Sequence, residues 1–326
     1  MTEPSIWWFV SDLHLQAQAT DDRGIGQVFP EFVSHEVLTD ARPDRHLVLL
    51  GDTFEVRTRG RRHSGGSSAR EQVADVADRY PGIFDALRTC IQAGVTVHAV
   101  CGDHDVALAG PGVRELLLSR LTAHLHEGDA SRFRLHPWLV HEPGLLYAEH
   151  GHQHCALNRY PALLAASEDG PSYFLGQTPR GAWTAADGAV HRAGDVVSAW
   201  SSQRRAERTA RGTEYESLLR AAAEESRLPD EAMLALHAAA RFHGLPAAAM
   251  AVQQRLPSHR GPGHHPGLLH GAAIRVDAIV AAAGPRPLCY VFGHSRRPAL
   301  VSLAGSRVFY ASAGSWAHLA DEVGPR

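Results

Sequence analysis

The sequence predicts an α/β fold, in which the strands of a largely buried sheet alternate with helices. Short, continuous apolar runs indicate strands with both faces buried. Stretches with helical periodicity separate several of these runs, and most of the runs end in aspartate, histidine or glycine residues. Ligands of α/β sheets bind beyond the carboxyl ends of the strands, so the same pattern also indicates where a functional site would lie.

Five apolar runs predict core strands, at residues 6–10, 46–50, 95–100, 145–148 and 288–292. A sixth run, 308–311, predicts a last strand before a Gly-Ser-Trp turn. Helical patterns cover residues 68–93 and 113–124. From about residue 158 to 285 the chain becomes Ala-rich and helical in pattern, with its last helix at 268–283. We therefore expect a helical insertion, or cap, on an α/β core.

The bulk properties are those of an ordinary globular protein. The 326 residues suffice for one large core with a smaller appended domain, and the hydrophobic content is 44%. The formal net charge of −3 gives no sign of a nucleic-acid partner. No run reaches the roughly 18 apolar residues of a membrane span. The four cysteines are scattered, as in a reducing compartment, and the N-terminus lacks a signal-peptide pattern, so we expect a cytoplasmic protein.

Polar clusters follow the five core strands. They read SDLHL, GDTFE, CGDHD, EHGHQH and GHSRRP. Each is a weak signal alone, because an Asp-x-His pair is more often a surface turn than a pair of ligands. Together they supply the carboxylate and imidazole ligands that a pair of divalent cations requires.

The order of the clusters resembles the motif series of the calcineurin-like metallophosphoesterases, which runs DxH, GD, GNH(D/E), a His-Gly element and GHxH. The resemblance covers about residues 5–160 and 286–317. The stretch EHGHQHCALNRYP looks closest to large bacterial members, relatives of the UDP-2,3-diacylglucosamine pyrophosphohydrolases. The matching residues are Asp12, His14, Gly51, Asp52, Gly102, Asp103, His104, Asp105, His150, Gly151, His152, Gly293 and His294.

The resemblance implies a four-layer α-β-β-α sandwich. Residues 1–157 and 286–326 would form the metallophosphoesterase core, and 158–285 the helical insertion. The implied activity is hydrolysis of a phosphomonoester, phosphodiester or pyrophosphate bond through a metal-bridging hydroxide. The substrate would be a phosphorylated small molecule or a nucleotide. Two divalent metal ions are implied, with Mn²⁺ expected and Fe or Zn²⁺ as alternatives.

The resemblance also assigns roles to individual residues. His104 would donate a proton to the leaving group, and Asp105 would orient it. The alternative for that pair is a buried hydrogen bond that only shapes the loop. Apart from the resemblance, the position of His152 beside His150 predicts that it contacts the ligands without binding metal or, alternatively, that it replaces one of them. The implied metal ligands are Asp12 and His14 at the first metal, Asp52 bridging both, and Asp103, His150 and His294 at the second.

Two residues depart from the family pattern. Asp103 stands where the family has asparagine, and it can still ligate through oxygen with one more negative charge. Arg296 stands where the family has a second histidine, and it cannot ligate because guanidinium stays protonated. We expect Arg296 to replace part of the missing ligand's electrostatic role, by binding substrate phosphate or by pairing with Asp103.

The alternative function is a degenerate fold of this type that has lost a metal and acts as a non-catalytic binding scaffold. Six of the expected metal and acid positions are retained, which favours an enzyme: Asp12, His14, Asp52, His104, His150 and His294.

Overall fold

A computed structural model gives the architecture of the chain. It describes residues 5–17, 24–56, 68–109, 111–122, 125–154, 227–229, 232, 235–236, 266–295, 297–303 and 307–316. Arg296 and most of the expected helical insertion lie outside these residues. The boundaries of the two expected domains therefore stay a prediction.

The first sheet is entirely parallel, with strand order β1-β2-β3-β4. Its strands are β1 (Ile6–Val10), β2 (Arg45–Leu50), β3 (Thr96–Val100) and β4 (Phe133–His136). Parallel pairing places the carboxyl ends of all four strands at one edge of the sheet.

The second sheet is mixed, with strand order β5-β6-β7-β9-β8. Its strands are β5 (Leu139–Glu142), β6 (Leu146–Glu149), β7 (Cys289–Phe292), β8 (Ala299–Ser302) and β9 (Phe309–Ser312). Strands β6, β7 and β9 run parallel to one another, whereas β5 and β8 are antiparallel edge strands.

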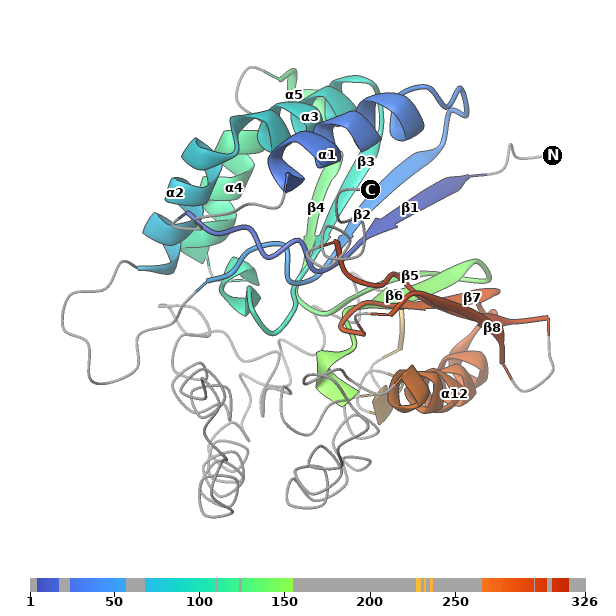
Figure 1. Cartoon of the computed structure of the whole chain (residues 1–326). Coiled ribbons are helices and arrows are strands. Elements are labelled where there is room, and N and C mark those ends of the chain that lie inside the picture. The colour runs from blue at the N-terminus through green and yellow to red at the C-terminus, as the bar shows by residue number, and fades with distance from the viewer. Residues whose placement is uncertain are drawn as a thin grey trace, which may run out of the picture.

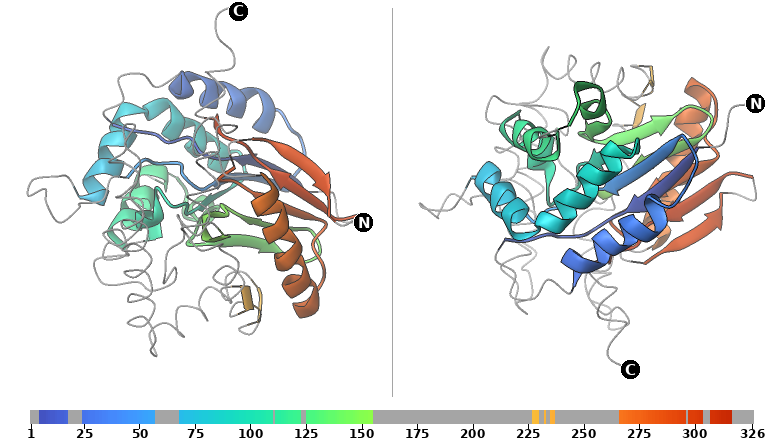
Figure 2. Two further views of the ribbon diagram at one scale, coloured as in Figure 1. Left: turned by 60° about the horizontal axis from the view of Figure 1, so that its bottom comes forward. Right: turned by 90° about the horizontal axis from the view of Figure 1, so that it is seen from above.

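Helices cover the face of the first sheet that points away from the second sheet (Figures 1 and 2). They are α1 (Ile25–Phe32), α2 (Ala69–Arg79), α3 (Pro81–Gln92), α4 (Pro111–Thr122) and the short α5 (Glu127–Ala130). Phe29 of α1, Ile83 and Leu87 of α3 and Leu117 of α4 lie in one apolar cluster with the strand residue Val97.

The two sheets face each other across a smaller apolar cluster that includes Val48, Val100, Val140, Ala148 and Val291. The opposite face of the second sheet packs against α12 (Pro266–Ala283), the last helix in Figure 1. Small residues on α12 allow this close packing. Those that share a buried cluster with the sheet are Ala272, Ala273, Val276 and Val280, with Tyr290, Phe292 and Tyr310 opposite them.

The α/β prediction is confirmed, and the six predicted strands and the helix at 268–283 each match a structural element to within two residues. The helical pattern over 68–93 corresponds to two helices, which meet at Tyr80 and Pro81. A residue before proline is driven out of the helical conformation, and Tyr80 has φ −117° and ψ 55°. Strands β4, β5 and β8 were not predicted.

Candidate metal centre

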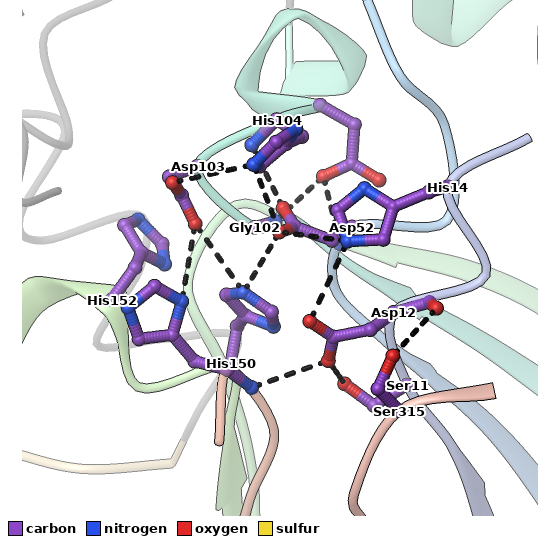
Figure 3. Close-up of polar contacts among 12 residues, drawn as sticks. Ser11, Asp12, His14, Asp52, Gly102, Asp103, His104, His150, His152 and Ser315 are labelled. Carbon is purple, nitrogen blue, oxygen red and sulfur yellow. Dashed lines mark hydrogen bonds and ion pairs between the residues drawn. The ribbon is translucent and has the colours of Figure 1, made fainter. Parts of the chain in front are cut away.

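The polar clusters meet at the carboxyl ends of five strands. Strands β1, β2 and β3 are parallel neighbours in the first sheet, and β6 and β7 are parallel neighbours in the second. Because the sheets face each other, residues almost 300 positions apart become neighbours: the backbone N–H of His294 donates a hydrogen bond to Asp12. The strand order therefore gathers the sequence motifs at one place (Figure 3).

Three groups of side chains in this place could each hold a metal ion. One of them is His14, Glu55 and His104, and the other two share one carboxylate. Within each group the candidate ligand atoms all lie within 4.8 Å of one another. Asp52 belongs to both of the latter groups, as a bridging ligand would. The first group is Asp12, His14 and Asp52, and the second is Asp52, Asp103, His150 and His294. These are the six residues that the resemblance names as ligands.

The orientation of His150 fits a metal ligand. Its Nδ1 lies 2.8 Å from the backbone carbonyl oxygen of Leu50, so the neutral imidazole carries its proton on Nδ1 and donates it there. The other nitrogen, Nε2, is buried, lies 3.3 Å from Asp52 Oδ2 and 3.4 Å from Asp103 Oδ1, and makes no well-formed hydrogen bond. A histidine held by a carbonyl in this way presents its lone pair to a cation.

The carboxylate of Asp12 is positioned on one side by hydrogen bonds. Its Oδ2 accepts from the hydroxyl of Ser11 and from the backbone N–H of His294. The other oxygen, Oδ1, lies 3.7 Å from Nε2 of His14. This arrangement leaves Oδ1 and the imidazole facing the same point.

The backbone is strained at the candidate ligands. Five non-glycine residues of the described part of the chain have a positive φ, and four belong to the centre, with φ from 49° to 57°: Asp12, His14, Asp52 and His294. Such a conformation costs on the order of 1 kcal/mol for a residue with a side chain. Backbone hydrogen bonds hold two of these positions, from Asp12 N–H to Gly51 O at 3.1 Å and from His14 N–H to Asp52 O at 2.9 Å. Strain of this kind concentrates at functional sites.

Three glycines make room for the cluster. A Cβ on Gly51 would lie 2.5 Å from the ring of His150, and one on Gly293 would lie 2.3 Å from Ser11 Oγ. At Gly102 the added atom would lie 2.2 Å from Asp52 Oδ1 and 2.5 Å from the backbone nitrogen of Asp52. A methyl group at position 102 can therefore be accommodated only by moving the shared carboxylate.

We expect Gly102→Ala to weaken metal binding at least about tenfold, the scale seen when groups that support metal ligands are removed. Isothermal titration of the metal-free protein with Mn²⁺ measures this. Gly112→Ala is the matched control, because Gly112 lies in α4 and a Cβ there meets no atom within 4 Å. Equal Mn²⁺ affinity in the two variants would contradict the tight fit at Gly102.

Without metal, the carboxylates and imidazoles of the centre stabilise one another's charges. Burial alone would lower the pKa of His14, but the nearby carboxylates of Asp12 and Glu55 outweigh it and raise that pKa to about 10. Burial opposes ionisation of Asp103 as well, yet the charge of His294 and other contacts hold its pKa below the ordinary value. A cation that enters must displace the imidazole protons, so metal binding is expected to release protons.

His104 is held by Glu55. Its Nδ1 makes a short contact with Glu55 Oε2, and the same oxygen lies 3.0 Å from Nδ1 of His14. Nε2 of His104 points toward the centre, at 3.7 Å from Asp52 Oδ2. The side chain is 24% exposed, so a substrate can approach this nitrogen.

The orienting role predicted for Asp105 needs correction. Its buried carboxylate accepts hydrogen bonds from backbone N–H groups of Asp52, Thr53, Phe54 and Gly102, at 2.7 to 3.3 Å. Asp105 therefore fixes the turn that carries the shared ligand, while Glu55 contacts the imidazole. Burial and the charge of Asp52 raise the pKa of Asp105 to about 6.

His152 lies behind the candidate ligands. Its ring centroid is 5.4 Å from that of His150 and 6.4 Å from that of His294, and its side chain is buried. Burial lowers the pKa of His152 to about 3, so the ring is neutral at pH 7. It belongs to none of the candidate metal groups among the described residues. Arg296, the remaining predicted site residue, lies outside the described part of the chain.

Sequence reasoning missed two residues of the site. Glu55 stands three positions after Asp52 in GDTFE, and that acidic residue beside the motif was the available signal. Ser11, directly before Asp12, carried no signal beyond its place at the end of a strand.

Comparisons with known proteins add little to this geometry. No family model matches the chain, and no curated protein matches it either. One solved structure with a detectable similarity is the phosphopantetheinyl hydrolase PptH from Mycobacterium tuberculosis. The identity is 15%, the alignment covers 97% of this chain and 91% of that one, and the TM-score is 0.32. A TM-score this low does not establish a common fold.

Among the described helices, none combines the length and apolar character needed to cross a membrane.

Proposed function

We propose that the chain is a metal-dependent phosphoesterase, which hydrolyses a phosphomonoester, phosphodiester or pyrophosphate bond. The observation that carries this proposal is the pair of candidate ligand groups that share the carboxylate of Asp52. One shared carboxylate between two sets of Asp and His ligands is what a pair of adjacent cations requires. The stacking of helices, two facing sheets and α12 supports a four-layer sandwich of the calcineurin-like metallophosphoesterase type.

Two divalent cations would be held by the residues already described. Asp12 and His14 would hold one cation, Asp103, His150 and His294 would hold the other, and Asp52 would bridge them. When bound, two such cations would polarise phosphoryl oxygens and lower the pKa of water. Three carboxylates and several imidazoles favour Mn²⁺ or Fe, and Zn²⁺ also accepts this donor set.

The chain's own residues would handle the proton of the leaving group. His104 presents Nε2 toward the centre from a partly exposed position, while Glu55 contacts its other nitrogen. An imidazole anchored at Nδ1 by a carboxylate can hold a proton on Nε2 and donate it to a departing alkoxide. Arg296, at its predicted place beside the fifth motif, would bind a phosphate oxygen of the substrate.

A panel of chromogenic phosphomonoesters and phosphodiesters, each assayed with and without Mn²⁺, tests the proposal. We expect turnover of at least one class with Mn²⁺ and none after chelation. The absence of turnover from a protein that still binds metal would favour the non-catalytic scaffold instead.

Glu55→Gln is expected to reduce kcat about 10- to 100-fold, because one charged oxygen contacts both His14 and His104. A neutral amide of the same size keeps the packing but loses the charge. Steady-state kinetics on the substrate identified by the panel measures the effect. Glu115→Gln, at an exposed position of α4, is the control. An unchanged kcat in Glu55→Gln would contradict a role of Glu55 in the activity of the site.

A further inference from the structure

The third group of potential metal ligands lies beside the two that share Asp52. It consists of His14, Glu55 and His104, whose candidate ligand atoms all lie within 4.8 Å of one another. The three residues follow β1, β2 and β3, which are parallel neighbours in the first sheet. Their side chains are 15% to 24% exposed, so a cation can reach them from solvent.

One carboxylate oxygen of this group lies between two imidazole nitrogens. Oε2 of Glu55 lies 3.0 Å from Nδ1 of His14 and makes a short contact with Nδ1 of His104. The two rings meet edge to face, with centroids 4.5 Å apart and an interplanar angle of 80° (Figure 3). Ligand atoms around a tetrahedral Zn²⁺ are about 3.3 Å apart, because the bonds are about 2.0–2.2 Å long. The 3.0 Å contact is near this spacing, and a small outward rotation of His104 reaches it at the other nitrogen.

Backbone hydrogen bonds hold the three ligand-bearing loops together. The N–H of Glu55 donates to the carbonyl oxygen of Leu15 at 3.0 Å. The N–H of Val56 donates to the carbonyl oxygen of His104 at 3.2 Å. The residues on either side of the carboxylate are therefore tied to the loops that carry the two histidines. Ligands positioned in advance reduce the entropy lost on binding.

His14 belongs to two of the three groups but can serve only one of them at a time. A neutral imidazole has one lone pair and one N–H. Nε2 of His14 faces Asp12 Oδ1 at 3.7 Å and Asp52 Oδ2 at 3.9 Å, whereas Nδ1 faces Glu55. The tautomer of His14 therefore selects between two alternative places for a cation. We call them the carboxylate position (Asp12, His14 and Asp52) and the imidazole position (His14, Glu55 and His104).

The two positions suit different cations. The carboxylate position offers two carboxylates and one imidazole, a set rich in oxygen that favours Mn²⁺. The imidazole position offers two imidazoles and one carboxylate, a donor set that catalytic zinc sites use with a fourth place left for water. Zn²⁺ should therefore prefer the imidazole position, and Mn²⁺ the carboxylate position.

We propose that His14, Glu55 and His104 form a Zn²⁺ site, which is an alternative to the carboxylate position and inhibits the enzyme when it is filled. The inhibition rests on the proposed phosphoesterase function, whereas the Zn²⁺ site itself does not.

Filling the imidazole position would disable two residues of the proposed centre. His104 would bind the cation through Nδ1, so that Nε2 keeps the last ring proton and could release it only by forming an imidazolate. It would no longer act as a proton donor. His14 would turn an N–H toward Asp12 and Asp52, so the carboxylate position would lose its imidazole ligand. Excess Zn²⁺ should therefore inhibit the Mn²⁺ enzyme.

Metal titration of the full-length, metal-free protein tests the site without any assay of activity. Competition with a coloured chelator gives the affinity for each equivalent of Zn²⁺ and, in a separate titration, of Mn²⁺. The wild type should bind two equivalents of either cation. One would go to the four-ligand group that contains His150, and the other to a position that uses His14.

Two variants should have opposite effects on this other equivalent. Among the groups of described residues, His104 belongs only to the imidazole position and Asp12 only to the carboxylate position. We expect His104→Gln to weaken the binding of Zn²⁺ at least about tenfold and to leave that of Mn²⁺ unchanged. Asp12→Asn should weaken Mn²⁺ and leave Zn²⁺ unchanged. His126→Gln, at an exposed position before α5, is the control and should change neither.

The outcomes separate this proposal from the proposed function. Equal Zn²⁺ affinity in the wild type and in folded His104→Gln would overturn the Zn²⁺ site. A fall in Zn²⁺ affinity in Asp12→Asn would also overturn it, because the two positions would then not be alternatives. If the titrations agree but no phosphoester is hydrolysed, the phosphoesterase proposal fails and the Zn²⁺ site stands. An active Mn²⁺ enzyme that keeps its full rate when Zn²⁺ fills the site would overturn the inhibition.

Discussion

The Asp52→Asn variant is expected to bind neither metal ion. Its kcat/KM for the phosphoesterase reaction is expected to be at least about 1000-fold lower than that of the wild type. Asp52 is the carboxylate common to both ligand groups. Its Oδ1 accepts the backbone N–H of His104 at 2.7 Å, and its Oδ2 lies 3.3 Å from His150 Nε2. An amide at this position supplies one oxygen and no charge, so it cannot bridge two cations. Metal centres of this kind supply several kcal/mol of transition-state stabilisation, and each 1.36 kcal/mol corresponds to a factor of ten in rate.

Elemental analysis and kcat/KM, determined on the same preparation, measure the Asp52→Asn effect. Asp78→Asn, which removes an exposed carboxylate on α2, is the control for net charge. A thermal unfolding scan shows whether both variants fold. Full metal content and wild-type turnover in folded Asp52→Asn would exclude the shared carboxylate as a bridge.

His104→Gln is expected to lower kcat about 10²- to 10⁴-fold while metal content stays unchanged, because general acid catalysis contributes on that scale. His104 belongs to neither of the two groups proposed to hold the cations, and its Nε2 faces the centre. The loss should depend on the leaving group. An alkyl phosphate needs a proton on departure, whereas p-nitrophenolate leaves without one, so the alkyl ester should show the larger loss.

Parallel assays of an alkyl and a p-nitrophenyl ester decide this point. His126→Gln is a control at an exposed position before α5. A loss of the same size on both esters would assign His104 to binding or structure rather than to proton transfer.

The position of the candidate site could be predicted from the sequence, because parallel strands place their carboxyl ends together. The motifs after β1, β2 and β3 had to meet at one edge once these runs were taken as buried parallel strands. The meeting with the motifs after β6 and β7 needed the second sheet, and only the resemblance supplied it. Strands β4 and β5 lie at sheet edges and mix charged or histidine residues with apolar ones, and the edge strand β8 is mostly exposed. None of the three therefore shows the continuous apolar run of a strand buried on both faces.

Side-chain partners inside the site could not be predicted, because they depend on local backbone geometry. The family resemblance assigned Asp105 the role of orienting His104. The left-handed backbone at Asp52 instead leaves several N–H groups that require an acceptor, and Asp105 fills that need. The same turn carries Glu55 toward His104.

Contacts among three histidines on neighbouring strands of the first sheet show the same limit at longer range. His46, His98 and His136 are separated by 52 and 38 positions, so no local pattern connects them. Their contact follows from strand register, which pairs Val48 with His98 and Val100 with His136. Register is a property of the assembled sheet and is not visible in any one strand.

Metal stoichiometry of the wild-type protein tests the central claim most directly. The protein would be stripped with a chelator, reloaded with Mn²⁺, freed of excess metal and measured by elemental analysis. We expect two Mn²⁺ ions per chain, because two groups of ligands share Asp52. A folded protein that retains one ion or none would contradict a dinuclear centre.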